Sequence, residues 1–162
     1  MGFVSQNIFL SEGSIAENVA FGIPKNQISL KKVKQAIEKA HLTEMVDALK
    51  EGIDTKVGER GIQLSGGQRQ RVGIARALYH QTDVLVFDEA TSSLDGITEK
   101  KIMDAINDLS GQKTIILIAH RIKTIRNCDE IFLINKGKVL DHGSYEELIK
   151  NNKQFQDMTH NA

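Results

Sequence analysis

The sequence predicts an α/β protein with a layered sheet whose central strands run parallel, and three observations support this fold class. Apolar runs of strand length occur at 84–87 and 114–119, and a third, at 131–134, lies in a strand predicted at 130–134. Helical patterns precede the first run, at 68–79, and separate it from the second, at 99–109. Strands that alternate with helices are typical of a parallel sheet. Because the runs are unbroken rather than alternating, we expect the first two strands to be buried on both faces.

Residues 13–64 show a different pattern, which is helical and rich in polar residues. A capping box at 14–17, in which Ser is followed three residues later by Glu, predicts a helix start. Apolar residues at helical spacing predict a second helix over 30–40 and a short third helix over 42–49. Another capping box, at 144–147, predicts the start of a C-terminal helix.

The composition narrows the class of protein. The chain has 162 residues, with 21 Lys plus Arg and 21 Asp plus Glu, so the formal net charge is zero. A neutral chain lacks the basic field that holds nucleic-acid phosphates, and we expect no nucleic-acid partner. No apolar run approaches the roughly 20 residues of a membrane-spanning helix, and no signal-peptide pattern opens the sequence. Because the single Cys128 also suits a reducing compartment, we expect a cytosolic chain.

Residues 64–68 read Leu-Ser-Gly-Gly-Gln and stand directly before the helix predicted at 68–79. Ser65 can cap that helix, and paired glycines let the backbone approach a ligand closely. The free N–H groups and the dipole at a helix N-terminus favour an anion, phosphate above all. An ordinary Ser-Gly-Gly turn before a helix is the alternative interpretation, because both residue types are common in turns.

Two acidic residues, Asp88 and Glu89, follow the first predicted strand. Ligands of open α/β sheets bind at the carboxyl ends of the strands, so a site is expected here. One carboxylate can hold Mg²⁺, and the other can orient or deprotonate an attacking water. His120 follows the second strand and, in a parallel sheet, emerges at the same edge. The alternatives are solvated acids at a strand end and a histidine that caps the next helix.

Taken in order, these features resemble the nucleotide-binding domain of ATP-binding cassette (ABC) transporters. The series is Leu-Ser-Gly-Gly-Gln, a helix, four apolar residues with Asp-Glu, Ser-Ser-Leu-Asp at 92–95, and a strand followed by His. The resemblance covers nearly the whole chain and implies a P-loop NTPase (RecA-like) fold, its C-terminal half together with the ABC α-helical subdomain. It implies a Q-loop region at 1–12, a helical subdomain with the signature loop at 13–82, and the C-terminal part of the ATPase core at 83–162.

The resemblance also implies roles in binding and hydrolysing ATP. In the family, the signature loop closes over the γ-phosphate of an ATP that is held by a second nucleotide-binding domain in a head-to-tail dimer. The residues that match this loop's ligand-contacting positions are Ser65, Gly66, Gly67 and Gln68. Asp88 matches the Walker B residue on the Mg²⁺ side, and Glu89 matches the catalytic base.

Three further residues match family motifs. Asp95 ends the stretch that is similar to the D-loop, where Ser93 stands in place of the usual Ala. His120 matches the switch histidine that contacts the γ-phosphate. Gln6 matches the Q-loop glutamine, which senses Mg²⁺ and contacts the transmembrane domain, and Ser5 precedes it where family members usually carry Pro.

Two stretches, 4–22 and 57–61 around Glu59, resemble exporter-type ABC proteins. This resemblance implies contact with a transmembrane domain through the Gln6 and Glu59 regions, a location at the cytoplasmic face of a membrane, and export of a lipid, glycan or peptide. Two other functions stay open at this point. One is a soluble ABC ATPase that is not a transporter, and the other is a non-catalytic module that completes the ATP site of a partner.

The family's phosphate-binding loop, Gly-x4-Gly-Lys-Ser/Thr, does not occur in these 162 residues. That loop cradles the β- and γ-phosphates, so we expect the isolated chain to be inactive. We expect the chain to be the part of a nucleotide-binding domain that lacks the N-terminal strands and the Walker A loop. An exposed sheet edge and apolar surface are therefore expected where those strands would pair.

Overall fold

The computed structural model describes residues 1–58, 63–90, 94 and 96–160. The chain forms two compact units, Met1–Ile118 and Ala119–Ala162, and the division follows directly after a strand. The part boundaries predicted after residues 12 and 82 stay predictions. Within the described ranges, none of the helices combines the length and the apolar character needed to cross a membrane.

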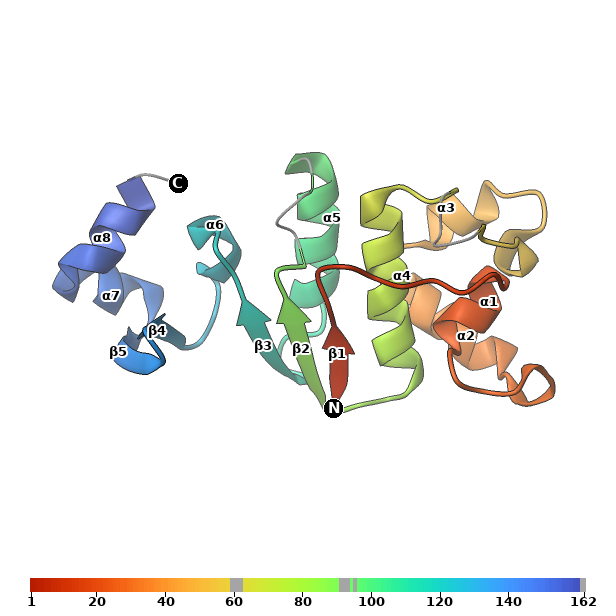
Figure 1. Ribbon diagram of the computed structural model, residues 1–162, viewed down its shortest axis with the longest axis horizontal. Helices are drawn as coiled ribbons and strands as arrows, with labels where there is room; N and C mark the ends of the chain where they lie inside the picture. The colour runs from red at the N-terminus through yellow and green to blue at the C-terminus, as the bar shows by residue number, and fades with distance from the viewer. Residues whose placement is uncertain (59–62, 91–93, 95, 161–162) are drawn as a thin grey trace. The chain divides into compact units, whose positions relative to one another are not determined.

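The described part of the first unit contains a sheet of parallel strands, which confirms the predicted fold class (Figure 1). The strands are β1 Gly2–Val4, β2 Val84–Asp88 and β3 Thr114–Ile118, in the order β1-β2-β3. The register pairs Phe3 with Val86, and Val86 with Ile116. Because the strands are parallel, their carboxyl ends all lie at one edge of the sheet.

The helices of the first unit begin close to where the sequence predicts helix starts. Ser14 and Ser65 each close a complete capping box, and α4 begins at Gly66 rather than at 68 because Ser65 is its N-cap. Short 3₁₀ turns occupy Lys25–Gln27 and Gly52–Asp54. The α-helices are α1 Ile15–Val19, α2 Leu30–Lys39, α3 Thr43–Asp47, α4 Gly66–Tyr79 and α5 Gly96–Asn107.

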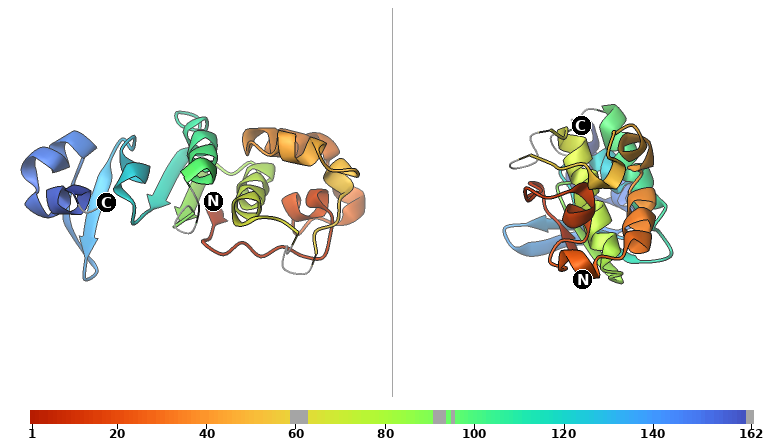
Figure 2. Two further views of the ribbon diagram at one scale, coloured as in Figure 1. Left: turned by 90° about the horizontal axis from the view of Figure 1, so that it is seen from above. Right: turned by 90° about the vertical axis from the view of Figure 1, so that its right-hand side faces the viewer.

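Helix α4 is the central element of the first unit. It packs against β1 and α5 as well as against α1 and α2. Figure 2 shows it between the strands and the helices that precede it in the chain. Most of its residues are buried as a result. Helix α4 therefore links the sheet to the helical part of the unit.

The burial of the sheet differs from the prediction. Leu85 and Phe87 of β2 are buried within the core formed with α4 and α5, but Val86 is only half-buried and Ile116 of β3 is 48% exposed. The expectation that both strands are buried on both faces is wrong, because the core cluster covers one face of the sheet. Apolar side chains on the other face are exposed, among them Phe3 and Ile116. The apolar surface expected at the sheet edge, where the N-terminal strands would pair, stays a prediction.

The second unit is built on an antiparallel strand pair, β4 Ile131–Asn135 and β5 Lys138–Gly143. In the described structure, the strand predicted at 130–134 therefore does not join the parallel sheet. It pairs with the strand that follows because Lys136 and Gly137, both at positive φ, form a tight two-residue turn. The helices of this unit are α6 Ile122–Ile125, α7 Tyr145–Asn151 and α8 Lys153–His160.

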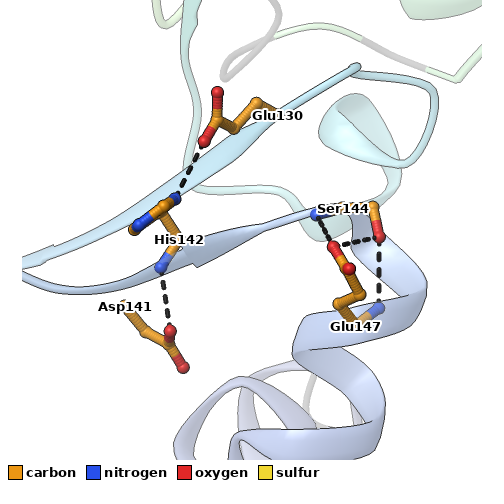
Figure 3. Close-up of polar contacts among 5 residues, drawn as sticks. All are labelled: Glu130, Asp141, His142, Ser144 and Glu147. Atoms are coloured by element: carbon orange, nitrogen blue, oxygen red, sulfur yellow. Dashed lines mark hydrogen bonds and ion pairs between the residues drawn. The ribbon is translucent and has the colours of Figure 1, made fainter.

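Polar contacts stabilise the strand pair and the helix after it (Figure 3). Nδ1 of His142 lies 2.8 Å from the Glu130 carboxylate, and its ring stacks on Phe132. Ser144 caps α7, with its N–H donating to Glu147 Oε2 over 2.9 Å. That backbone hydrogen bond is the main cause of the lowered pKa of Glu147. These contacts have a structural role, because they hold the strand pair and the start of α7 in place.

Candidate functional site

The candidate site lies at the carboxyl edge of the parallel sheet. The first turns of α4 and α5 lie at the same end of the first unit as the strand ends (Figure 1). Gln6 comes two residues after β1, Asp88 is the last residue of β2, and Glu89 follows it. Chain direction thus places the backbone N–H groups of helix starts at the same end of the unit as the side chains that follow the strands, where ligands of α/β sheets bind.

Gln6 and Glu89 are in direct contact, although 83 residues separate them. The side-chain Nε2 of Gln6 donates a hydrogen bond of 3.2 Å to Glu89 Oε2. Glu89 has a φ of 49°, an uncommon conformation for a residue with a side chain. Its N–H donates to the carbonyl of Ile118 over 2.9 Å, which ties this strained residue to the end of β3. Strained backbone of this kind is concentrated at functional sites.

Asp88 supplies a second carboxylate at the same edge. It is half-buried and pairs in register with Ile118 of β3. Within the described residues, no group of three or more His, Cys, Asp or Glu is arranged to hold a metal ion. Mg²⁺ is usually bound through one or two carboxylates together with substrate phosphates and water. The side chains present, with the amide of Gln6 as another oxygen donor, therefore fit Mg²⁺ that arrives with a nucleotide.

The start of α4 is ordered by a capping box. Ser65 Oγ accepts from the N–H of Gln68 over 3.2 Å, and the N–H of Ser65 donates to Gln68 Oε1 over 2.8 Å. Ser65 and Gly66 are exposed. An exposed helix start with an electrically neutral cap presents the positive end of the helix dipole, and such a start favours an anion.

The two glycines of this motif differ in their surroundings. A Cβ on Gly67 would collide with Cγ2 of Thr98, in the first turn of α5. A Cβ on Gly66 would lie in ordinary contact with Leu94, at 3.5 Å. Close packing between α4 and α5 therefore requires glycine at position 67, a structural reason that is separate from any approach to a ligand.

Several predicted site residues are not placed with this group. His120 belongs to the second unit, two residues after β3, and is exposed. Asp95, with Ser92 and Ser93 of the same motif, lies outside the described residues, and so does Glu59 with 60–61 of its stretch. The structure therefore assembles Gln6, Asp88 and Glu89 at one edge. The predicted roles of all the site residues stay predictions.

The residues that hold the segment carrying Gln6 were not predicted from the sequence. They lie on one face of α4 and are Gln70, Gly73 and Arg76, each in contact with the chain between β1 and α1. Burial lowers the pKa of the Arg76 guanidinium. The signal available in the sequence is the spacing of three residues, which places Gln70, Gly73 and Arg76 along one side of the helix.

The comparisons with known proteins point to one family. A family model described as "ABC transporter" matches residues 1–92 of the chain. A solved structure described as a bacterial Atm1-family ABC exporter with ATP bound superposes with a TM-score of 0.88 at 36% sequence identity. That match covers 99% of this chain and 28% of the exporter chain.

Curated relatives agree with this assignment. The ATP-dependent lipid A-core flippase of Cupriavidus metallidurans is 43% identical over 153 residues, covering 94% of this chain and 26% of that protein. The protein of the same description from Vibrio vulnificus is 46% identical over 147 residues, covering 91% of this chain and 25% of its own length. The chain thus spans about a quarter of the length of these relatives.

Proposed function

We propose, on the premise that this chain belongs to the ABC transporter family, that it is the part of an exporter's ATPase domain that carries the signature loop and the catalytic carboxylates. ATP binding and hydrolysis in that domain drive the export of a lipid. The observation that carries the proposal is the hydrogen bond between Gln6 and Glu89, beside Asp88 at the carboxyl edge of the sheet. The names of the relatives, lipid A-core flippases, support a lipid as the substrate.

In this proposal, each residue of the edge has one chemical task. The Glu89 carboxylate orients the attacking water and accepts its proton, and Gln6 holds that carboxylate in place through its amide. His120 contacts the γ-phosphate. The capped start of α4, from Ser65 to Gln68, directs backbone N–H groups at the γ-phosphate of an ATP bound to the opposing domain. Asp95 completes that interface.

Asp88 and the Gln6 amide oxygen are the groups that would hold Mg²⁺. The chemistry that Mg²⁺ would supply there is neutralisation of the charge on the transferred phosphoryl group. Phosphoryl transfer depends mostly on positioning and on charge stabilisation. The main task of this chain's residues is therefore to hold donors and carboxylates still and to exclude water.

The partners in this proposal are a second nucleotide-binding domain, in a head-to-tail dimer, and a transmembrane domain at the cytoplasmic face of the membrane. Contact with the transmembrane domain is proposed through the Gln6 and Glu59 regions. Exposed aromatic side chains close to Gln6 support this surface: Phe9 is 61% and Phe21 42% exposed, with their rings edge to face at 6.5 Å.

A chimeric exporter tests the proposed function. This chain replaces the aligned 153 residues of the Cupriavidus metallidurans flippase, which supplies the rest of the sequence. The resulting grafted exporter is reconstituted in lipid, and Mg·ATP hydrolysis is measured with and without lipid A-core. We expect hydrolysis that the lipid stimulates. A grafted exporter that folds but does not hydrolyse ATP would favour a non-catalytic module, and hydrolysis indifferent to the lipid would contradict the coupling to transport.

Substitution of the proposed base is the first specific prediction. Glu89→Gln keeps the size of the side chain but removes its proton-accepting charge, so the rate should fall by about 100-fold or more, with ATP still bound. Glu38→Gln, the same change at an exposed position on α2, is the matched control and should leave the rate unchanged. Turnover in Glu89→Gln close to that of the parent would remove Glu89 from the role of base.

A further inference from the structure

The segment that follows β1, residues 5–9, is held along one face of α4. Gln70, Gly73 and Arg76 of that helix are spaced three residues apart and so lie on one side of it. The first contact is a hydrogen bond of 3.0 Å from Nε2 of Gln70 to the carbonyl of Ser5. Gln70 is only 4% exposed, so its hydrogen bond to the first residue of the segment is shielded from water.

The second contact is steric. A Cβ on Gly73 would lie 2.5 Å from Cδ1 and 2.9 Å from Cγ1 of Ile8. Real Cβ atoms do not approach other carbons that closely, so glycine at this position lets Ile8 lie directly on the helix backbone. The segment is therefore packed against α4 at its middle as well as bonded at its start.

The third contact is made by Arg76, which joins three parts of the first unit. Its Nη2 donates to the carbonyl of Phe9 and its Nε to the carbonyl of Asn18, each over 3.0 Å. The guanidinium carbon lies 4.5 Å from the centre of the Phe21 ring. Asn18 is fully buried and in turn donates to the carbonyl of Ser11, so the next part of the segment is fixed too.

Gln6 lies between these contacts. Ser5 is tied to α4 on one side, Ile8 and Phe9 on the other, and the amide of Gln6 reaches Glu89. From this geometry we propose that Arg76 is a positioning residue, which fixes the segment to α4 so that the Gln6 amide stays at Glu89. Because α4 begins at the signature loop, a displacement of that loop is then carried along the helix to the catalytic carboxylate.

The fork of the guanidinium suits this task. Its Nε and Nη2 donate in fixed directions to two carbonyls that belong to different segments. Lys keeps the charge but has a single, flexible ammonium group, so it cannot reproduce both bonds in that geometry. Arg76→Lys is therefore the substitution that loosens the segment while it disturbs the helix least.

The first test uses this chain alone and does not depend on catalysis. The side-chain amide signal of Gln6 and the backbone amides of residues 5–9 are followed by NMR in the parent, in Arg76→Lys and in Arg71→Lys. Arg71 is a matched control on the same helix, because its guanidinium bonds to the carbonyl of His41 and not to the segment. We expect shifted signals and faster amide exchange over 5–9 in Arg76→Lys only. Unchanged signals there would overturn the inference.

The second test uses the grafted exporter and rests on the proposed function. Arg76→Lys should lower kcat by about tenfold, the effect of losing one good hydrogen bond to a charged group, with the KM for ATP changed much less. The half-saturating Mg²⁺ concentration should rise. In a Gln6→Ala background, Arg76→Lys should change kcat by no more than about twofold. Losses that multiply in the double variant would show a merely structural role and overturn the inference.

A steric variant provides an independent check. Gly73→Ala forces Ile8 away from the helix and should lower kcat as Arg76→Lys does. Adding Ile8→Ala removes the colliding atoms and should restore most of the rate, whereas failure of this rescue would count against the packing step. An unsubstituted grafted exporter without ATPase activity would refute the proposed function but leave the NMR result to decide the role of Arg76.

Discussion

Helices α1 and α4 begin with the same local structure but differ in the charge of one residue. At each start a Ser side chain accepts the N–H of the third helical residue, whose side chain accepts the N–H of the Ser. In α1 the accepting side chain is the carboxylate of Glu17, at 2.7 Å, and in α4 it is the neutral amide of Gln68, at 2.8 Å. Ser14 is buried, whereas Ser65 is exposed.

This difference separates a helix start that stabilises the fold from one suited to an anion. Glu17 neutralises the positive end of α1 and is itself paired with Lys25 at 3.2 Å. Gln68 satisfies the same backbone group without adding charge, so the positive end of α4 stays available to a phosphate. Substitutions at the two helix starts should therefore differ in their effects on ATP hydrolysis and on stability.

The largest effect is expected from giving α4 the cap of α1. Gln68→Glu places a carboxylate where the γ-phosphate is proposed to bind, and repulsion between like charges at a closed interface should lower the ATPase rate of the grafted exporter by roughly 100-fold. The melting temperature of this chain should not fall, because Glu caps a helix as well as Gln. ATPase activity within about threefold of the parent would contradict the proposed role of this helix start.

Removal of each cap hydroxyl should have a smaller effect. Both variants should lose stability, but only one should lose activity. Ser14→Ala and Ser65→Ala should each lower the free energy of unfolding by about 1 kcal/mol, measured by urea unfolding of this chain. Only Ser65→Ala should also lower ATP hydrolysis in the grafted exporter, by about tenfold. Equal losses of activity in the two variants would mean that both serines act through stability alone.

The smallest effect is expected from removing the negative charge of Glu17 at the start of α1. The hydrogen bond from the Ser14 backbone, with a smaller contribution from Lys25, holds the pKa of Glu17 below its ordinary value of 4.5. A lowered pKa in the folded state means that Glu17 stabilises the fold above pH 4.5 and that this contribution is lost as the pH falls through the lowered pKa.

Glu17→Gln should therefore cost about 0.5 kcal/mol at neutral pH and almost nothing at strongly acidic pH. Urea unfolding of the parent and the variant between pH 3 and 7 measures this difference. A difference in stability that does not shrink toward acidic pH would show that the charge of Glu17 is not responsible. ATP hydrolysis by the grafted exporter should be unaffected, in contrast to Gln68→Glu.

Features that depend on a few neighbouring residues were predictable from the sequence. The capping boxes at Ser14 and Ser144 have the predicted bonds, and α4 starts at the motif that predicted it. The parallel pairing of the strands at 84–87 and 114–119 followed from the helix between them. The capping boxes rest on side-chain reach within one turn of chain, and the parallel pairing rests on the crossover helix that joins two strands consecutive in the chain.

Predictions that needed knowledge of distant partners were less successful. An unbroken apolar run predicted burial on both faces, yet Ile116 and Ile118 are each 48% exposed, because burial depends on which layers cover the sheet. The strand predicted at 130–134 is present, but its partner was not predictable: it pairs antiparallel with the strand that follows it, because a two-residue turn joins them. The apolar character of a strand predicts that it is buried, but it does not identify the elements that bury it.

The sequence by itself determined the family, the order of the motifs and the residue types at the candidate site, because spacing and local hydrogen bonding specify these. Only the tertiary structure decided that Gln6 contacts Glu89 across 83 residues and that Arg76 holds the segment 5–9 on α4. The physical reason is that such contacts require the packing of whole elements, which no short window of sequence contains. Local sequence specifies the residue types at the site, and the packing of helices and strands decides which of these residues are in contact.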